Sequence, residues 1–209
     1  MSAGNDIVFL PATRPERTTH PRFYPRIITP AEQQLLPALD LPFDQGVWLC
    51  WSIKESAYKY HRRHSTGLQF APLKITVNEF SCNGDFYFST VSTGSGPLHA
   101  RSLVRDGIIV SIVSSDENFR DTHWGFRQIG SPAYRVQSPA VRAFALQELK
   151  TVLRRDDLRI EKDAEGCPRV LAEDPGLSVP VSLAHHDRYV AWSFTYSASS
   201  LRSKRSVAV

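Results

Sequence analysis

Hydrophobic residues near the start of the chain form first a short run and then a helical pattern. The run DIVFL at residues 6–10 ends at Pro11 and predicts an opening strand. Residues 47–63, VWLCWSIKESAYKYHRR, contain no glycine or proline and have the spacing of an amphipathic helix. The polar, proline-containing stretch between them predicts loops interrupted by one short helix.

The short helix is predicted by a capping signal. Thr29 stands at the N-cap position, Pro30 at the first helical position and Glu32 three residues after the cap, which is the pattern of a capping box. Ile28 precedes the cap as the hydrophobic staple residue. The helix is expected to run to about Leu36.

Hydrophobic runs separated by turn signals dominate the middle of the chain, residues 68–113. The runs LKITVNEF, DFYFSTVST and GIIVSIVSS are separated by glycine-containing turns at 83–84, 94–96 and 106–107. Turns of this kind join antiparallel strands, so the block is predicted to be rich in β-structure.

The last third of the chain combines one helix with two hairpins. Ser-Pro at 138–139 is expected to open the helix, and residues 158–170 predict the first hairpin. Residues 179–196 predict two strands around a polar turn at 185–187. No internal repeat is visible. Helices that alternate with antiparallel hairpins predict an α+β fold rather than a doubly wound parallel sheet.

Length and composition fit a single globular domain. The chain has 209 residues, of which 42% are hydrophobic and 22% charged, enough for a core without disulfide bridges. No apolar run approaches the length of a membrane span, and the N-terminus lacks the pattern of a secretory signal. The 3 cysteines, with no CxxC spacing, favour reduced thiols. We therefore expect a cytoplasmic protein with no membrane partner.

The formal net charge of +4 suits an acidic protein, a nucleic acid or a phosphorylated ligand as partner. Part of the excess lies at 198–209, which is expected to be a flexible basic tail. A nucleic-acid surface would stack bases on Phe80, Phe86, Tyr87 and Phe88. Because lysine and arginine are sparse around these rings, we expect no nucleic-acid partner.

Charged residues on the 47–63 helix are the first candidates for chemistry. Trp51, Glu55 and Lys59 share one face of it. A Glu–Lys pair at this spacing is ordinarily a solvated salt bridge. The flanking Trp48 and Tyr58 indicate a largely buried helix, whose charges need a partner such as a metal ion with phosphates.

Other candidate residues are weaker. Asp6 opens a hydrophobic strand, and either a turn role or a functional role fits it equally well. His61 and His64 have no cysteine or acid at zinc-ligand spacing. The sequence lacks the motifs GxSxG, GxGxxG and GxxxxGK[ST], so hydrolase, dinucleotide and P-loop chemistry are disfavoured.

Five segments, taken in order, resemble the 4′-phosphopantetheinyl transferases, especially the compact holo-acyl-carrier-protein synthase type. The segments are GNDIV at 4–8, RFYPRIITPAE at 22–32, WSIKESAYK at 51–59, the hairpin at 157–170, and VSLAH with YVA within 181–191. Ser56, Cys167 and Ala184 stand where the family usually has Ala, Lys, and Ser or Thr. The resemblance implies the family's antiparallel sheet with packed helices, as one domain over 1–197 with a β-rich insertion at 68–156.

The same resemblance implies the cofactors and the residue roles. Mg²⁺ would be held by Asp6 and Glu55, and coenzyme A would be the co-substrate. Lys59 would contact the diphosphate and His185 a phosphate of coenzyme A. Either Glu55 or water on the metal would take the proton of the attacking serine. The full set of expected coenzyme A contacts is Lys54, Lys59, Ser182 and His185.

The implied partner is an acidic acyl carrier protein, with Arg14, Arg22 and Arg26 as contacts at the rim of the site. Compact family members share each active site between protomers, which implies a homotrimer here. The alternative is a catalytically weak relative that acts as a coenzyme A-binding or scaffold module. The sequence leaves the carrier protein and its pathway open.

Overall fold

The computed structural model describes residues 3–65, 67–173 and 177–197, so the expected tail at 198–209 lies outside the described residues. The first half of the chain contains β1 (Ala3–Phe9), α1 (Pro15–Thr18), α2 (Pro30–Leu35), α3 (Phe43–Arg62), β2 (Thr76–Val77), β3 (Ser81–Asn83), β4 (Phe86–Ser92), β5 (Pro97–Arg105) and β6 (Ile108–Ser114). The second half contains β7 (Thr122–Gln128), α4 (Tyr134–Leu153), β8 (Arg159–Lys162), β9 (Pro168–Leu171), β10 (Ser178–His186) and β11 (Tyr189–Thr195). Short 3₁₀ turns are η1 (Leu10–Ala12), η2 (Tyr24–Arg26), η3 (Leu36–Leu39) and η4 (Pro72–Lys74).

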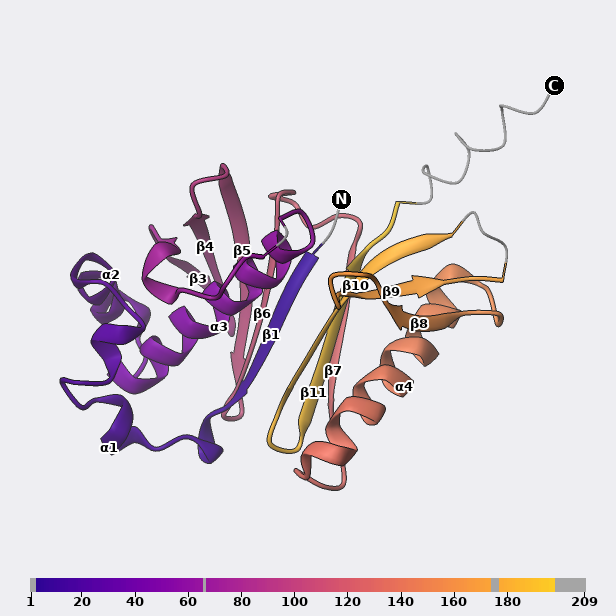
Figure 1. The fold of residues 1–209 in the computed structure, drawn as a ribbon. Coiled ribbons are helices and arrows are strands. Elements are labelled where there is room, and N and C mark those ends of the chain that lie inside the picture. The colour runs from indigo at the N-terminus through magenta and orange to yellow at the C-terminus, as the bar shows by residue number, and fades with distance from the viewer. Residues whose placement is uncertain (1–2, 66, 174–176, 198–209) are drawn as a thin grey trace.

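The strands form two antiparallel sheets, one in each half (Figure 1). The first sheet has the order β1-β6-β5-β4-β2, with β3 paired to β4, and the second has the order β7-β11-β10-β9-β8. The long helix α3 packs on β1 and β6, and α4 packs on β10 and β11. The α+β class and the fold expected from the family resemblance are confirmed.

The two halves repeat one topology, although no repeat is visible in the sequence. Strands β1, β6, β5, β4 and β3 follow each other in the same order as β7, β11, β10, β9 and β8. In both halves the two central strands form a hairpin with a two-residue turn that begins at an aspartate with φ 52°, Asp106 or Asp187. Residues 68–156 are therefore integral to both sheets, because they supply β2 to β6 in one half and β7 and α4 in the other.

Two boundaries in the second half differ from the expectation. Helix α4 begins at Tyr134, before the Ser-Pro pair, and contains Pro139. The Gln137 side chain donates to the carbonyl of Asp187 at 2.6 Å, which fixes this extra turn. The expected turn at 185–187 is wrong in part because both histidines belong to β10, where His186 Nδ1 accepts the Phe9 N–H at 2.8 Å.

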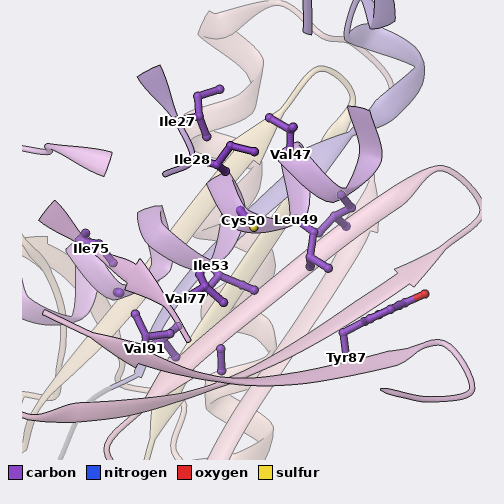
Figure 2. Close-up of a cluster of buried hydrophobic side chains, with 14 of the residues drawn as sticks. Ile27, Ile28, Val47, Leu49, Cys50, Ile53, Ile75, Val77, Tyr87 and Val91 are labelled. Atoms are coloured by element: carbon purple, nitrogen blue, oxygen red, sulfur yellow. The ribbon is translucent and has the colours of Figure 1, made fainter. Parts of the chain in front are cut away.

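The core of the first half lies between α3 and the sheet. Ile53 on α3, Val77 on β2 and Val91 on β4 point toward one another in Figure 2, and all three are buried. The predicted capping box of α2 is present, since Thr29 Oγ1 accepts from Glu32 N at 3.2 Å and Glu32 Oε2 accepts from Thr29 N at 2.7 Å. Within the described residues, no helix is both long and apolar enough to cross a membrane.

A buried ion pair joins α2, α3 and β2. Lys54 Nζ donates to Glu32 Oε2 at 2.7 Å and to the Ile27 carbonyl at 2.8 Å, and both charged side chains are 0% exposed. The other carboxylate oxygen of Glu32 accepts the Val77 N–H at 2.8 Å. Each charge is therefore satisfied by the other and by backbone groups, as burial requires.

Strand β1 passes α3 at a distance that only glycine allows. A Cβ on Gly4 would lie 2.0 Å from the Ser56 carbonyl oxygen and 2.8 Å from Tyr60 N, both backbone atoms that cannot turn away. The other edge of β1 meets the second half, where Asn5 N donates to Ser182 Oγ at 3.0 Å. The position of β1 is thus fixed from two sides.

We expect Gly4→Ala to destabilise the protein by about 3 kcal/mol, because the added methyl must push α3 away from β1. The unfolding midpoint in urea measures this. Gly130→Ala is the control, since nothing lies within 4 Å of its added Cβ. Equal midpoints for the two variants would contradict the close approach.

We expect Lys54→Met to cost about 3–5 kcal/mol, because it leaves the Glu32 carboxylate buried without its cation. The double variant Lys54→Met/Glu32→Gln should recover part of this loss, since the neutral amide no longer needs a counter-charge. Chemical denaturation of the three proteins gives the comparison. A single variant as stable as the parent protein would show that the ion pair contributes nothing.

Candidate active site

Asp6 lies in the middle of β1, on the face toward α3. Its side chain is 9% exposed, and Oδ1 accepts from Lys59 Nζ at 3.1 Å. The second carboxylate oxygen, Oδ2, is buried and has no partner among the described residues. The interpretation of Asp6 as a turn residue before the strand is wrong, because Asp6 lies within β1, and its functional role stays a prediction.

Glu55 and Lys59 lie one helical turn apart on α3 and face Asp6. Lys59 Nζ is 3.5 Å from Glu55 Oε1, so one ammonium group bridges two carboxylates. The side chains of Glu55 and Lys59 are 27% and 22% exposed, which leaves both open to a ligand from solvent. The predicted shared face of the helix is present.

The electrostatics of this cluster are those of two acids with one cation. Burial raises the pKa of Glu55, and the nearby charge of Asp6 raises it further against the opposing effect of Lys59. Burial by itself lowers the pKa of Lys59, but the two carboxylates outweigh it and raise that pKa overall. The acids therefore repel each other, and added positive charge would stabilise them.

His185 on β10 brings the second half to this cluster. Its charge interacts with Lys59 and with Glu55. Burial lowers the pKa of His185, and Lys59 lowers it further, so the imidazole is neutral at neutral pH. Its ring contacts that of Tyr134, the first residue of α4, with centroids 5.9 Å apart.

One chain thus supplies all four groups, Asp6, Glu55 and Lys59 from its first half and His185 from its second. The arrangement needs no second protomer to bring the terminal histidine to the acids. The homotrimer implied by the resemblance stays a prediction.

The structure does not bring Lys54 or Ser182 to this cluster. Lys54 points into the core, where Glu32 holds its ammonium group at 0% exposure. Ser182 is 1% exposed and accepts the Asn5 N–H. Both residues make contacts that stabilise the fold, Lys54 with Glu32 and Ser182 with the backbone of Asn5.

The two carboxylates fit a magnesium ion. Mg²⁺ is typically bound by one or two carboxylates together with waters and substrate phosphates. The buried, unpartnered Oδ2 of Asp6 and the repulsion between Asp6 and Glu55 both fit a cation at this place. No group of three or more His, Cys, Asp or Glu residues that could hold a metal is found in the described part of the chain, so such an ion would depend on substrate or water for its other ligands.

The two halves share a topology but not the residues of the candidate site. Strand registers place Gly125 of β7 where β1 has Asp6, and Val104 of β5 where β10 has His185. A Cβ on Gly125 would lie 3.2 Å from Trp192 Nε1, so this position is also tightly packed. The position of Asp6 therefore has no acid in the second half, and the position of His185 has no histidine in the first half.

A basic pocket lies next to β1 and was not predicted from the sequence. It has a volume of about 370 Å³ and is lined by Ala12, Thr13, Arg14, Arg17, Thr18, Phe23, Trp48 and His186. Arg17 lies over the Phe23 ring at 5.0 Å. Of the three arginines expected at the rim, Arg14 lines this pocket, whereas Arg22 and Arg26 do not. The spacing of Arg14 and Arg17 could have predicted the basic pocket, since residues three apart share one face of a helical turn.

Comparison with known proteins supports the family resemblance. The family model of the 4′-phosphopantetheinyl transferase superfamily matches residues 2–105. This match contains Asp6, Glu55 and Lys59 and ends before the second half, so it does not include His185. Among curated proteins, none shows a significant match to the chain.

We expect Asp6→Asn and Glu55→Gln each to weaken Mg²⁺ binding at least tenfold, because each removes one of two charged ligands. Isothermal titration calorimetry with MgCl₂ measures the affinity, both with and without coenzyme A. Asp44→Asn is the control, since Asp44 lies in the first turn of the same helix, 11 residues before Glu55. An unchanged affinity in both site variants would exclude this metal site.

Proposed function

The chain belongs to the 4′-phosphopantetheinyl transferase superfamily, and we propose that it transfers 4′-phosphopantetheine from coenzyme A to a serine of an acidic carrier protein. The family supports phosphopantetheine transfer in general, and coenzyme A is the substrate of this family. The observation that carries the more specific proposal is the Asp6–Lys59–Glu55 cluster with His185 beside it. Two acids, one ammonium and one imidazole are the groups needed to bind a diphosphate and direct attack on it.

The reaction exchanges one phosphorus–oxygen bond for another. The serine oxygen of the carrier bonds to the β-phosphorus of coenzyme A, and the bond from that phosphorus to the bridging oxygen breaks. Adenosine 3′,5′-bisphosphate leaves, and the serine loses its proton. Negative charge grows on the leaving phosphate, so the barrier depends on cations placed beforehand.

In this proposal Lys59 stabilises that growing negative charge. The two carboxylates of Asp6 and Glu55 hold its positively charged ammonium group at the site. Neutral His185 donates a hydrogen bond to a phosphate oxygen of coenzyme A. Glu55 is the more exposed of the two acids and accepts the serine proton. Asp6 and Glu55 would hold Mg²⁺, which would neutralise charge on the diphosphate.

The basic pocket suits the approach of the carrier protein. Arg14 and Arg17 line it, and neither has an ion-pair partner in the part of the chain that the structure describes. The Nδ1 of His186 accepts the Phe9 N–H, which leaves Nε2 as the protonated nitrogen of the neutral ring. Two guanidinium groups and an imidazole N–H are complementary to carboxylates, so we propose that acidic side chains of the carrier bind here.

We expect the protein, with coenzyme A and Mg²⁺, to add one phosphopantetheine group to an apo carrier protein, as measured by intact mass. Glu55→Gln should abolish the gain, because it removes the metal ligand and the base together. Coenzyme A binding without any mass gain across several carriers would instead support the scaffold alternative. No coenzyme A binding would exclude both.

We expect Arg14→Glu/Arg17→Glu to raise the KM for the carrier at least tenfold and to leave the KM for coenzyme A unchanged, because the pocket contacts only the protein substrate. Steady-state kinetics at two salt concentrations measures both constants. Arg120→Glu/Lys162→Glu, which reverses two exposed positive charges that do not line the pocket, is the control of equal total charge change. The same KM for carrier in both variants would place the docking surface elsewhere.

A further inference from the structure

Three buried polar atoms at the junction of the two halves have no hydrogen-bond partner among the described residues. They are Asn5 Nδ2, Asn5 Oδ1 and Ser193 Oγ, and both residues are 0% exposed. A buried polar group without a hydrogen-bond partner destabilises the folded state, so three unpaired groups in one place require an explanation. None of these atoms belongs to the cluster around Lys59.

Hydrogen bonding and strand pairing place Asn5 and Ser193 on facing surfaces. The backbone N–H of Asn5 donates to Ser182 Oγ at 3.0 Å, across the junction. Ser193 of β11 is the direct cross-strand partner of Ser182 of β10. Directly paired residues point to the same face of a sheet, so the Ser193 hydroxyl also faces β1.

The neighbours of Asn5 along β1 confirm that its side chain points into the junction. Side chains two apart on a strand share a face, so Asn5 lies between Ala3 and Ile7. Ala3 belongs to a cluster with Trp124, the β7 residue paired with Ser193. Ile7 belongs to a cluster with Ala184, which lies two residues beyond Ser182 on β10. The Asn5 side chain therefore points at the part of the second sheet where Ser182 and Ser193 lie.

The unpaired groups are chemically complementary through one water molecule. A carboxamide offers a donor and an acceptor, and a hydroxyl offers both. Buried waters occupy polar sites of this kind and make two to four hydrogen bonds. We propose that an ordered water bridges the Asn5 carboxamide to Ser193 Oγ across the junction, and that Asn5 is thereby a positioning residue for Asp6.

The proposed water bridge would position Asp6 because Asn5 and Asp6 are neighbours on β1. Asn5 directly precedes Asp6, and a bridge from its side chain to β11 adds to the bond from its backbone to β10. Together they fix the strand relative to the half that carries His185. The water itself is independent of the proposed function, whereas the positioning of Asp6 as a metal ligand rests on it.

A double-mutant cycle and a crystal structure test the bridge. Asn5→Leu removes the polar groups at similar volume, and Ser193→Ala removes the hydroxyl. We expect Ser193→Ala to shift the urea midpoint less in the Asn5→Leu background than in the parent protein, because the bridge is already lost there. The crystal structure should show a water within hydrogen-bond distance of both residues. Additive shifts together with no such water would overturn the proposal.

Magnesium affinity tests the positioning role separately. We expect Asn5→Leu to weaken Mg²⁺ binding about tenfold, as the loss of a residue that orients a metal ligand does, with coenzyme A affinity unchanged in the absence of metal. Ser89→Ala is the matched control, since Ser89 Oγ is also buried and has no partner within the described part of the chain, but lies on β4. Unchanged Mg²⁺ affinity in Asn5→Leu would exclude the positioning role. If the parent protein itself binds no Mg²⁺, the proposed function fails, while the crystal structure still decides the water.

Discussion

Strand β1 is packed between α3 on one side and the second half of the chain on the other, and the site depends on this double contact. Gly4 lets the strand backbone approach the Ser56 carbonyl more closely than any Cβ would allow. Because side chains alternate along a strand, Asp6 then faces α3 while Asn5 faces β10 and β11. The same two faces bring Asp6 to Lys59 and bring the half that carries His185 alongside.

Lys54 and Glu55 are consecutive residues on α3 with different roles: Lys54 stabilises the core, and Glu55 belongs to the candidate site. Successive residues on a helix point about 100° apart, so one side chain enters the core while the next faces the site. Lys54 pairs with Glu32 and ties α2 and β2 to α3. Glu55 remains partly exposed and faces Lys59. A rigid α3 holds Glu55 and Lys59 in place, and pre-organisation of this kind lets charges act on a diphosphate without first rearranging.

Local signals predicted the elements that depend on neighbouring residues. The capping box at Thr29, the helix over 47–63 and the hairpin turn at 106–107 follow from short-range hydrogen bonding and hydrophobic spacing. The start of α4 and the extent of β10 were mispredicted because long-range contacts decide them. Gln137 bonds to Asp187 and His186 bonds to Phe9, and neither partner lies near in sequence. The topological repeat was invisible because each half fills its core with different side chains.

The sequence by itself determined the α+β class from local hydrophobic patterns and turn signals, and its resemblance to the family supplied the candidates Asp6, Glu55, Lys59 and His185. The tertiary structure decided which candidates meet. Lys54 lies in the core, Ser182 lies at the junction between the halves, and His185 lies near Glu55 and Lys59 of the same chain. Burial and the approach of distant strands set these outcomes, and neither is encoded in the spacing of any single motif.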